Sequence, residues 1–174
     1  HIAPLKVPEK PLSVLPKKHD ATIPNEEQPE VLEKEACKVQ PLILVVEDNR
    51  DIALYLKSLL KESYNVITAR NGEEGLDVAE KRIPDLVITD LMMPVKDGIQ
   101  LTCEMKQNEL INHIPVIMLT AKSSEEDRIE GLRCGVEAYI RKPFQPEELL
   151  ISLKNIFENR RILKEKYMSA ITRN

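Results

Sequence analysis

The sequence lacks the features that mark several specialised classes of protein. No apolar run reaches the length of about 18 residues that a bilayer-spanning helix needs, so we expect no membrane contact by this segment. The formal net charge is −4, which argues against direct nucleic-acid binding, because such binding needs clustered positive charge. The chain begins at His1 rather than Met, so we expect a segment of a longer parent chain.

Cysteine is also scarce. The three cysteines, Cys37, Cys103 and Cys134, are odd in number and scattered along the chain. Their spacing fits neither a disulfide framework nor a zinc site. This usage favours a reducing compartment.

Residues 1–40 contain no glycine and no aromatic residue, yet they hold half of the prolines of the chain. Their charges alternate without a sustained apolar face, so the stretch can bury too little apolar surface to offset its ordering entropy. The composition predicts a Pro-rich flexible linker over residues 1–40.

From Pro41 onward, short apolar runs alternate with segments of helical spacing. A repeated order of strand and helix predicts an α/β fold, with a parallel sheet covered by helices on both faces. Ser124 and Asp127 resemble a capping box for the fourth helix, and Pro146 suits the first turn of the fifth. The expected strands are Leu42–Val46, Val66–Ala69, Leu86–Thr89, Val116–Leu119 and Ala138–Ile140.

Chemically active side chains follow four of these expected strands. Ligands in such sheets bind outside the carboxyl ends of the strands, so the residues there are the candidates for function. If the first, third, fourth and fifth strands lie together, their ends gather three carboxylates, a hydroxyl and an ammonium group. The residues concerned are Glu47, Asp48, Asp90, Thr120 and Lys142.

Three converging carboxylates repel one another strongly, and a hard divalent cation such as Mg²⁺ relieves that repulsion. Phosphoryl transfer needs such a metal, an in-line nucleophile and cationic groups for the developing charge. An ionised aspartate can act as the nucleophile and form an acyl phosphate. Any one of these residues alone would be read as a helix cap or a surface charge, so their joint placement carries the interpretation.

Four separated strings, VVEDN, DLMMPVKDG, PVIMLTA and YIRKPF, resemble those of the response-regulator receiver family in order and spacing over residues 41–158. The resemblance implies a flavodoxin-like (βα)5 doubly wound parallel sheet with strand order 2-1-3-4-5. It also implies that the domain catalyses its own phosphorylation, from a kinase phosphohistidine, and its own dephosphorylation. The signal would pass through the face of the fourth helix, fifth strand and fifth helix.

Carried over by position, the resemblance makes Asp90 the phosphoryl acceptor. Asp48 would bind Mg²⁺ directly, with Glu47 assisting, and the backbone carbonyl of Met92 would be another ligand. Thr120 would hydrogen-bond one phosphoryl oxygen and act as a switch residue, and Lys142 would form an ion pair with another. Tyr139 would be the switch aromatic, and the peptide bond before Pro143 would be cis.

The strings LTAKSSEEDRIEGL, IRKPF and ENRRILKEKY are similar to receivers of bacterial hybrid two-component systems. This implies a histidine kinase partner, which can lie on the same polypeptide, and an output in transcription control. The parent chain would then be a histidine protein kinase. The expected location is the cytoplasm, and the parent chain can be anchored in the inner membrane.

An apolar stripe with heptad-like spacing predicts an extended fifth helix, reaching about Tyr167, with residues 159–174 as a connector. Arg160 fills the missing position of the stripe. A homodimer through this C-terminal helix is one hypothesis, and a frayed tail is the alternative. The apolar members are Leu149, Leu153, Ile156, Leu163 and Tyr167.

Two other functions were weighed against the receiver interpretation. A Mg²⁺-dependent aspartyl-phosphate phosphatase usually has a second aspartate two residues after its nucleophile, and that position is Met92 here. A non-phosphorylated interaction module would be expected to lose acceptor-site residues, all of which are present.

Overall fold

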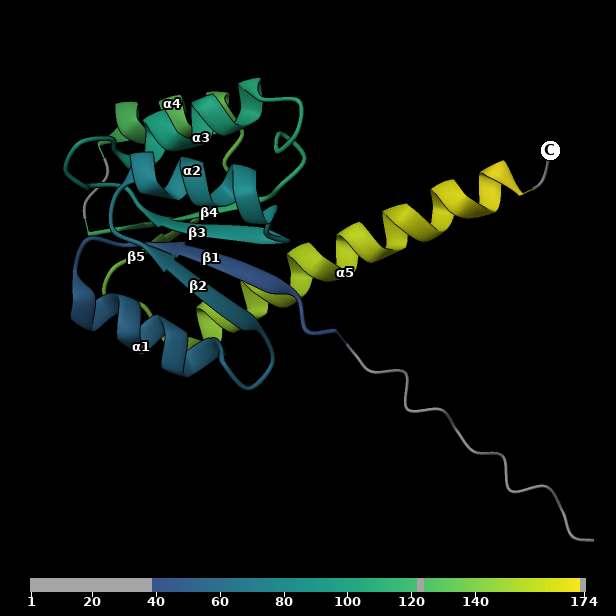
Figure 1. The fold of residues 1–174 in the computed structure, drawn as a ribbon, viewed down its shortest axis with the longest axis horizontal. Helices are drawn as coiled ribbons and strands as arrows, with labels where there is room; N and C mark the ends of the chain where they lie inside the picture. The colour runs from purple at the N-terminus through teal and green to yellow at the C-terminus, as the bar shows by residue number, and fades with distance from the viewer. Residues whose placement is uncertain (1–38, 122–123, 173–174) are drawn as a thin grey trace, which may run out of the picture. The chain divides into compact units, whose positions relative to one another are not determined.

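Five parallel strands form one sheet in the order β2-β1-β3-β4-β5 (Figure 1). The computed structural model describes residues 39–121 and 124–172, so Cys37 and nearly all of the expected linker lie outside the described residues. The predicted order and parallel sheet are confirmed, and each predicted strand agrees with an observed one to within a residue at either end. The strands are β1 (Leu42–Val46), β2 (Asn65–Ala69), β3 (Leu86–Asp90), β4 (Val116–Thr120) and β5 (Ala138–Arg141).

The helices cover both faces of the sheet. Figure 1 shows α2, α3 and α4 on one face and α1 and α5 on the other. Among the described residues, no helix combines the length and the hydropathy that crossing a membrane would require. The helices are α1 (Arg50–Leu60), α2 (Gly72–Arg82), α3 (Gly98–Gln107), α4 (Glu125–Cys134) and α5 (Pro146–Ile171).

The strands are apolar without interruption because both of their faces are buried. In β1, Ile43 and Val45 pack toward α1 and α5, while Leu44 and Val46 pack toward α2 and α3, and all four side chains are fully buried. This is the pattern of a parallel sheet between two helical layers. The two layers fix the sheet rigidly and leave its carboxyl edge open.

Side-chain caps start the helices directly after the strand ends. Asn49 accepts from the backbone of Asp51 and Ile52 at the start of α1, and Asp97 forms a capping box with Gln100 in α3. The predicted capping box between Ser124 and Asp127 is present in α4. These caps satisfy backbone N–H groups that the first turn leaves unpaired.

Helix α5 is a single helix of 26 residues, about 39 Å long at 1.5 Å per residue. It ends at Ile171, beyond the predicted end near Tyr167. Ile156 packs against the domain's own core, whereas Leu163 and Tyr167 are exposed. The extended C-terminal helix is therefore confirmed, and its exposed part begins after the core contacts.

The expectation that the cysteines are unpaired is wrong for two of them. Cys103 of α3 and Cys134 of α4 form a disulfide bond, with their Cα atoms 4.8 Å apart. They are 31 residues apart in the sequence, and only the packing of α3 beside α4 brings them together. The count and spacing of cysteines could not reveal this pair, because the contact depends on how two helices pack.

Candidate functional site

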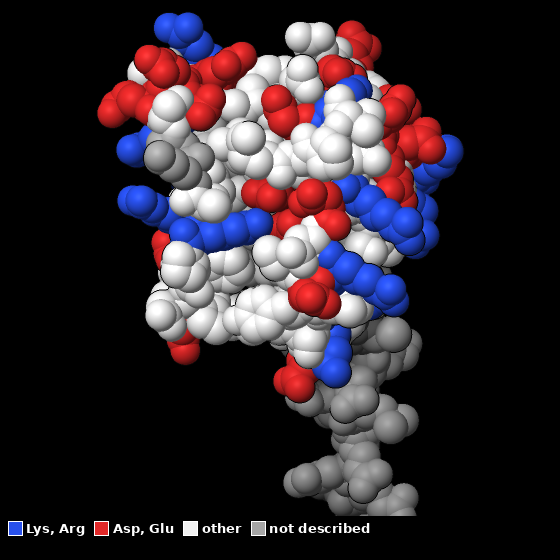
Figure 2. Space-filling model, turned by 90° about the vertical axis from the view of Figure 1, so that its left-hand side faces the viewer, with Lys and Arg blue, Asp and Glu red and all other residues white. Residues whose placement is uncertain are grey.

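The site lies at the carboxyl edge of the sheet, where the parallel register brings four strand ends together. Asp90 ends β3, and its neighbour in β4 is Leu119, so Thr120 lies one residue further along. Glu47 directly follows β1, and Lys142 directly follows β5. Figure 2 shows this edge: acidic side chains lie in the middle of the face, and basic side chains flank them.

Three carboxylates converge at this edge. One oxygen from each of Glu47, Asp48 and Asp90 lies within 4.8 Å of the others. Glu47 and Asp90 are buried and Asp48 is exposed. Buried like charges at this separation repel strongly unless a cation neutralises them. The donor set is therefore of the kind that binds Mg²⁺, which prefers carboxylate oxygens and water.

Glu47 is held by two donors. Its Oε2 accepts from Lys142 Nζ at 2.8 Å, and its Oε1 accepts from the backbone N–H of Asn49 at 3.2 Å. Burial raises the pKa of the Glu47 carboxyl above its usual value, although the hydrogen bond from Lys142 acts in the opposite direction. The raised pKa indicates that one ammonium group does not fully compensate the buried charge.

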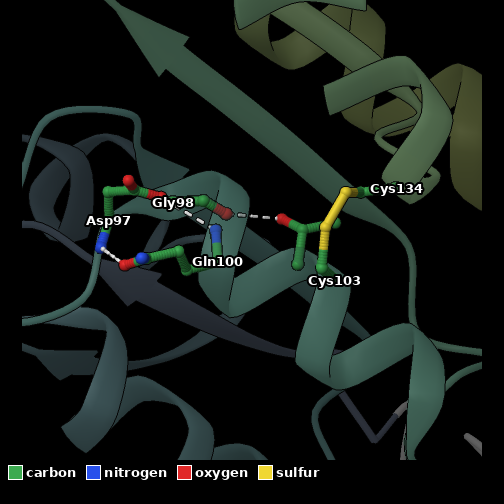
Figure 3. The surroundings of a disulfide bond; sticks show 6 residues. Asp97, Gly98, Gln100, Cys103 and Cys134 are labelled. Carbon is green, nitrogen blue, oxygen red and sulfur yellow. Dashed lines mark hydrogen bonds between the residues drawn. A yellow bond between two sulfur atoms is a disulfide. The ribbon is translucent and has the colours of Figure 1, made fainter. Parts of the chain in front are cut away.

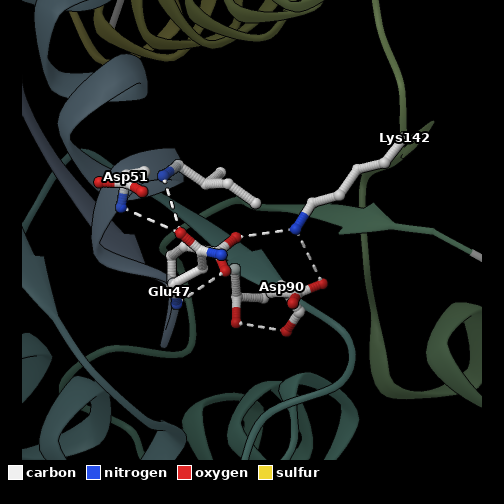
Figure 4. Close-up of polar contacts among 7 residues, drawn as sticks. Glu47, Asp51, Asp90 and Lys142 are labelled. Atoms are coloured by element: carbon white, nitrogen blue, oxygen red, sulfur yellow. Dashed lines mark hydrogen bonds and ion pairs between the residues drawn. The ribbon is translucent and has the colours of Figure 1, made fainter.

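Lys142 bridges the two buried carboxylates. Its Nζ lies 2.8 Å from Glu47 Oε2 and 3.3 Å from Asp90 Oδ1 (Figure 4). The Lys142–Pro143 peptide bond is cis. The two distances place the ammonium group between the carboxylates of Glu47 and Asp90, where it offsets part of their negative charge.

Thr120 presents an unused hydroxyl at the same edge. Its side chain is buried, and within the described residues its Oγ1 has no hydrogen-bond partner. A buried hydroxyl without a partner is costly, and native proteins usually keep one where a ligand or water supplies the partner. The neighbouring Thr89 differs, because its hydroxyl donates to the carbonyl of Asp90 at 3.0 Å.

The loop after β3 passes close to the acceptor. A Cβ atom at Gly98 would lie 2.3 Å from the carbonyl oxygen of Asp90, so only glycine fits there. The N–H of Gly98 donates to the carbonyl of Leu91, which closes the loop. Met92, two residues after Asp90, has an exposed side chain. This geometry places the buried Asp90 directly beside the closed loop that follows β3.

Tyr139 of β5 lies under α4. Its hydroxyl is buried and, within the described part of the chain, has no hydrogen-bond partner. A Cβ atom at Gly131 would lie 1.4 Å from that oxygen, so Tyr139 occupies the space that the missing side chain leaves. Burial raises the pKa of the Tyr139 phenol. The hydroxyl is therefore inside the protein rather than in water.

A cleft of about 480 Å³ opens beside the acidic cluster. It lies between the end of β1, the first two turns of α1 and the end of β2. Its charged lining residues are the acidic Glu47 and Asp48 and the basic Arg50, Lys57 and Arg70, and uncharged residues line the rest. Such a cleft can admit an anionic group to the carboxylates.

Every side chain predicted for the acceptor site is at this edge. Glu47, Asp48, Asp90 and Lys142 meet within a few ångströms, and Thr120 ends the neighbouring strand. The sequence reasoning missed the direct pair between Lys142 and Glu47. It also missed Gly131 as the contact of Tyr139, because neither pairing follows from spacing along the chain.

A five-stranded parallel sheet in the order 2-1-3-4-5, with helices on both faces, defines the doubly wound α/β class, whose ligands bind outside the carboxyl ends of the strands. Residues 43–154 match the family model described as the response regulator receiver domain. The chain belongs to this family.

Two curated relatives illustrate the contexts of such domains. Histidine kinase P4 of Formosa agariphila is 41% identical over 133 residues, which are 76% of this chain and 10% of that protein. The alkaline phosphatase synthesis transcriptional regulatory protein PhoP of Bacillus subtilis is 42% identical over 121 residues, 69% of this chain and 50% of that protein. The chain thus spans half or less of the length of these relatives.

Among solved structures, the receiver domain of a sensor histidine kinase from Pseudomonas aeruginosa is 32% identical, with a TM-score of 0.62. The match covers 67% of this chain and 96% of that one. That structure contains a magnesium ion coordinated in its active-site cleft.

Proposed function

We propose that this domain is the phosphoacceptor of a two-component phosphorelay and that Asp90 receives the phosphoryl group. The observation that carries the proposal is the surroundings of Asp90: its carboxylate lies 3.3 Å from Lys142 Nζ, beside two further acids and near the unpaired hydroxyl of Thr120. A nucleophile, a cation and a vacant donor are the parts that phosphoryl transfer needs.

The transfer runs from a phosphohistidine to Asp90. An oxygen of the ionised Asp90 carboxylate attacks the phosphorus, a P–O bond forms, and the P–N bond to the imidazole breaks with its electron pair left on nitrogen. Lys142 offsets the charge that gathers on the phosphoryl oxygens, and Thr120 donates its hydroxyl to one of them.

Mg²⁺ would be held by Asp48 and Asp90, with Glu47 and the backbone carbonyl of Met92 assisting. When bound, the ion neutralises the acids and the phosphoryl oxygens. The support for this assignment is the set of three carboxylates that share one small volume beside Lys142.

Acetyl phosphate with Mg²⁺ tests the assignment of Asp90. Wild type should gain the mass of one phosphoryl group, and the Asp90→Asn variant should gain none. Asp97→Asn is a matched control, because Asp97 lies in the same loop and asparagine caps a helix as well as aspartate does. Equal labelling of Asp90→Asn and wild type would refute the assignment. Release of phosphate from unrelated phosphomonoesters would instead favour the phosphatase alternative.

The donor in the cell would be a histidine kinase domain, which can lie on the same polypeptide, in a cytoplasmic setting. The output would be transcription control, passed through the face formed by α4, β5 and α5. Two observations support this face: Tyr139 of β5 lies directly under α4, and Ile129 and Leu132 of α4 are exposed apolar side chains. Such residues commonly mark surfaces for partners.

The exposed part of α5 would pair with a second copy. Leu163 and Tyr167 continue the stripe that Leu149 and Leu153 begin in the core, and both are more than half exposed. Arg160 occupies one stripe position, but Glu137 of its own chain lies 3.4 Å away and offsets its charge. Such a stripe suits a two-stranded coiled coil.

Truncation after Asn159 tests this pairing by analytical ultracentrifugation with beryllofluoride and Mg²⁺. The shortened chain should remain monomeric at concentrations where the full chain dimerises. Equal dimerisation of the two chains would show that the extension is not the interface.

A further inference from the structure

The Cys103–Cys134 disulfide bond connects two neighbouring helices at defined points. Cys103 lies in the middle of α3, and Cys134 is the last residue of α4 (Figure 3). Helix α3 starts at the loop that follows Asp90, where Asp97 caps it and the N–H of its first residue, Gly98, donates to the carbonyl of Leu91. The bond therefore ties the end of α4 to a helix that starts at the acceptor loop.

Helix α4 has few other attachments to the domain. Gly131 is its only buried residue in the described part of the chain, and its larger apolar side chains Ile129 and Leu132 are about half exposed. An element that buries so little apolar surface opens more easily than the core. The disulfide fixes this helix covalently to α3 at its last residue.

The same small cluster contains Tyr139. Both cysteines and Tyr139 pack against one small group of buried residues: Leu91, Ile99, Met118 and Val136. Among the residues that the structure describes, the Tyr139 hydroxyl stays buried against Gly131 without a partner, although water would satisfy it. A restraint must hold α4 over this hydroxyl, and the disulfide at Cys134, three residues from Gly131 on the same helix, supplies one.

We propose that Cys103 and Cys134 form a reversible redox site, whose disulfide holds α4 over Tyr139 and so favours the phosphorylated form of the domain. This inference rests on the proposed function and on the switch roles that the resemblance implies for Thr120 and Tyr139, in which phosphorylation draws Thr120 inward and Tyr139 fills the vacated space. The oxidised structure already holds Tyr139 inside. Reduction frees α4, and the phenol can then turn outward to water.

The chemistry is thiol–disulfide exchange with a low-molecular-weight thiol. Its thiolate attacks one sulfur, the bond between Cys103 and Cys134 breaks, and a mixed disulfide forms. A second thiolate then displaces the remaining cysteine sulfur. Two reductant thiols become one disulfide, and each cysteine gains one electron and one proton. Oxidation is the reverse, with a low-molecular-weight disulfide as the oxidant, and both cysteines are only half-buried.

Beryllofluoride binding with Mg²⁺ measures the coupling between the redox site and Asp90. The test uses the full chain with Cys37→Ser, so that only one cysteine pair remains, in oxidised and dithiothreitol-reduced form. The oxidised chain should bind at least about 5-fold more tightly, within the usual range of coupling between two sites. Cys103→Ser and Cys134→Ser should bind like the reduced chain under both conditions.

Hydrogen exchange of residues 124–134 supplies a second readout that does not depend on phosphorylation. Reduction should speed exchange in α4 and leave exchange in α1 unchanged. Equal affinity and equal exchange in the two forms would overturn the proposal, as would two titratable thiols after oxidation. If instead Asp90→Asn binds beryllofluoride as wild type does, the proposed phosphoacceptor fails, while the exchange result still reports on the disulfide.

Discussion

Replacing Gly131 with alanine should move Tyr139 out of its position under α4 while changing the folding stability little. The new Cβ atom would lie 1.4 Å from the Tyr139 hydroxyl oxygen and 2.8 Å from its ring carbon Cζ. No small adjustment relieves such an overlap, so the side chain must rotate toward solvent. The atoms in conflict belong to the far end of a side chain, which can move without moving β5.

Opposing free-energy terms decide the size of the effect. Alanine in place of glycine inside a helix favours folding by about 1 kcal/mol. Returning the unpaired hydroxyl to water recovers about 1–3 kcal/mol. Against this, the loss of ring packing costs at most about 3 kcal/mol, the value for a fully buried side chain, and Tyr139 is only partly buried. Even with the full packing cost, these terms allow a loss of at most about 1 kcal/mol in the free energy of unfolding.

Urea unfolding and tyrosinate absorbance together test this prediction. Burial raises the pKa of Tyr139, so exposure in Gly131→Ala should lower that pKa toward its usual value. Subtracting the titration of a Tyr139→Phe variant in each background isolates the one phenol from the other tyrosines. A loss of more than about 3 kcal/mol with an unchanged Tyr139 pKa would refute the reasoning, since the ring would then be locked in place.

Three further predictions concern the site and the disulfide. Without metal, stability should fall as the pH rises from 4.5 through the raised pKa of Glu47, because the folded state binds that proton more tightly than the unfolded chain. In urea unfolding, this decrease of stability with rising pH should be absent in Glu47→Gln and present in Glu73→Gln, a control at an exposed glutamate. Lys142→Met should lower the free energy of unfolding by up to about 3 kcal/mol, because it leaves the buried Glu47 carboxylate without its cation. The same substitution in a Glu47→Gln background should lower it by less, which would show that the two side chains are coupled. The Cys103–Cys134 disulfide closes a loop of 31 residues, which removes unfolded-state entropy worth about 3–4 kcal/mol. Reduction should therefore lower the Tm measured by calorimetry by roughly 10 °C in the wild-type chain and leave the Tm of Cys103→Ser unchanged.

The sheet and the acceptor edge were predictable because each rests on local pattern. Continuous apolar runs such as Leu42–Val46 identify doubly buried strands, and the residue after each run is then placed by the rule for parallel sheets. The caps at Asp97 and Ser124 follow from side-chain chemistry over three residues. Each of these features depends on residues that lie close together in the sequence.

Contacts between elements were not predictable in the same way. The pair between Lys142 and Glu47 joins residues 95 positions apart, and the disulfide depends on the packing of α3 beside α4. Likewise, the contact of Gly131 with Tyr139 depends on how α4 sits over β5. The end of α5 at Ile171 was underestimated because ion pairs of Arg161 with Glu158 and Glu165 support an exposed helix that has no apolar core to mark it.

The most direct test of the proposed function is to locate the phosphoryl group on the chain. Borohydride reduces an acyl phosphate to an alcohol, so a phosphorylated aspartate becomes homoserine and can be found by peptide mass mapping. After treatment with acetyl phosphate and Mg²⁺, conversion should occur at Asp90 alone and should disappear when the metal is chelated. Conversion at Asp48 or Asp97 instead, or none at any aspartate, would contradict the account.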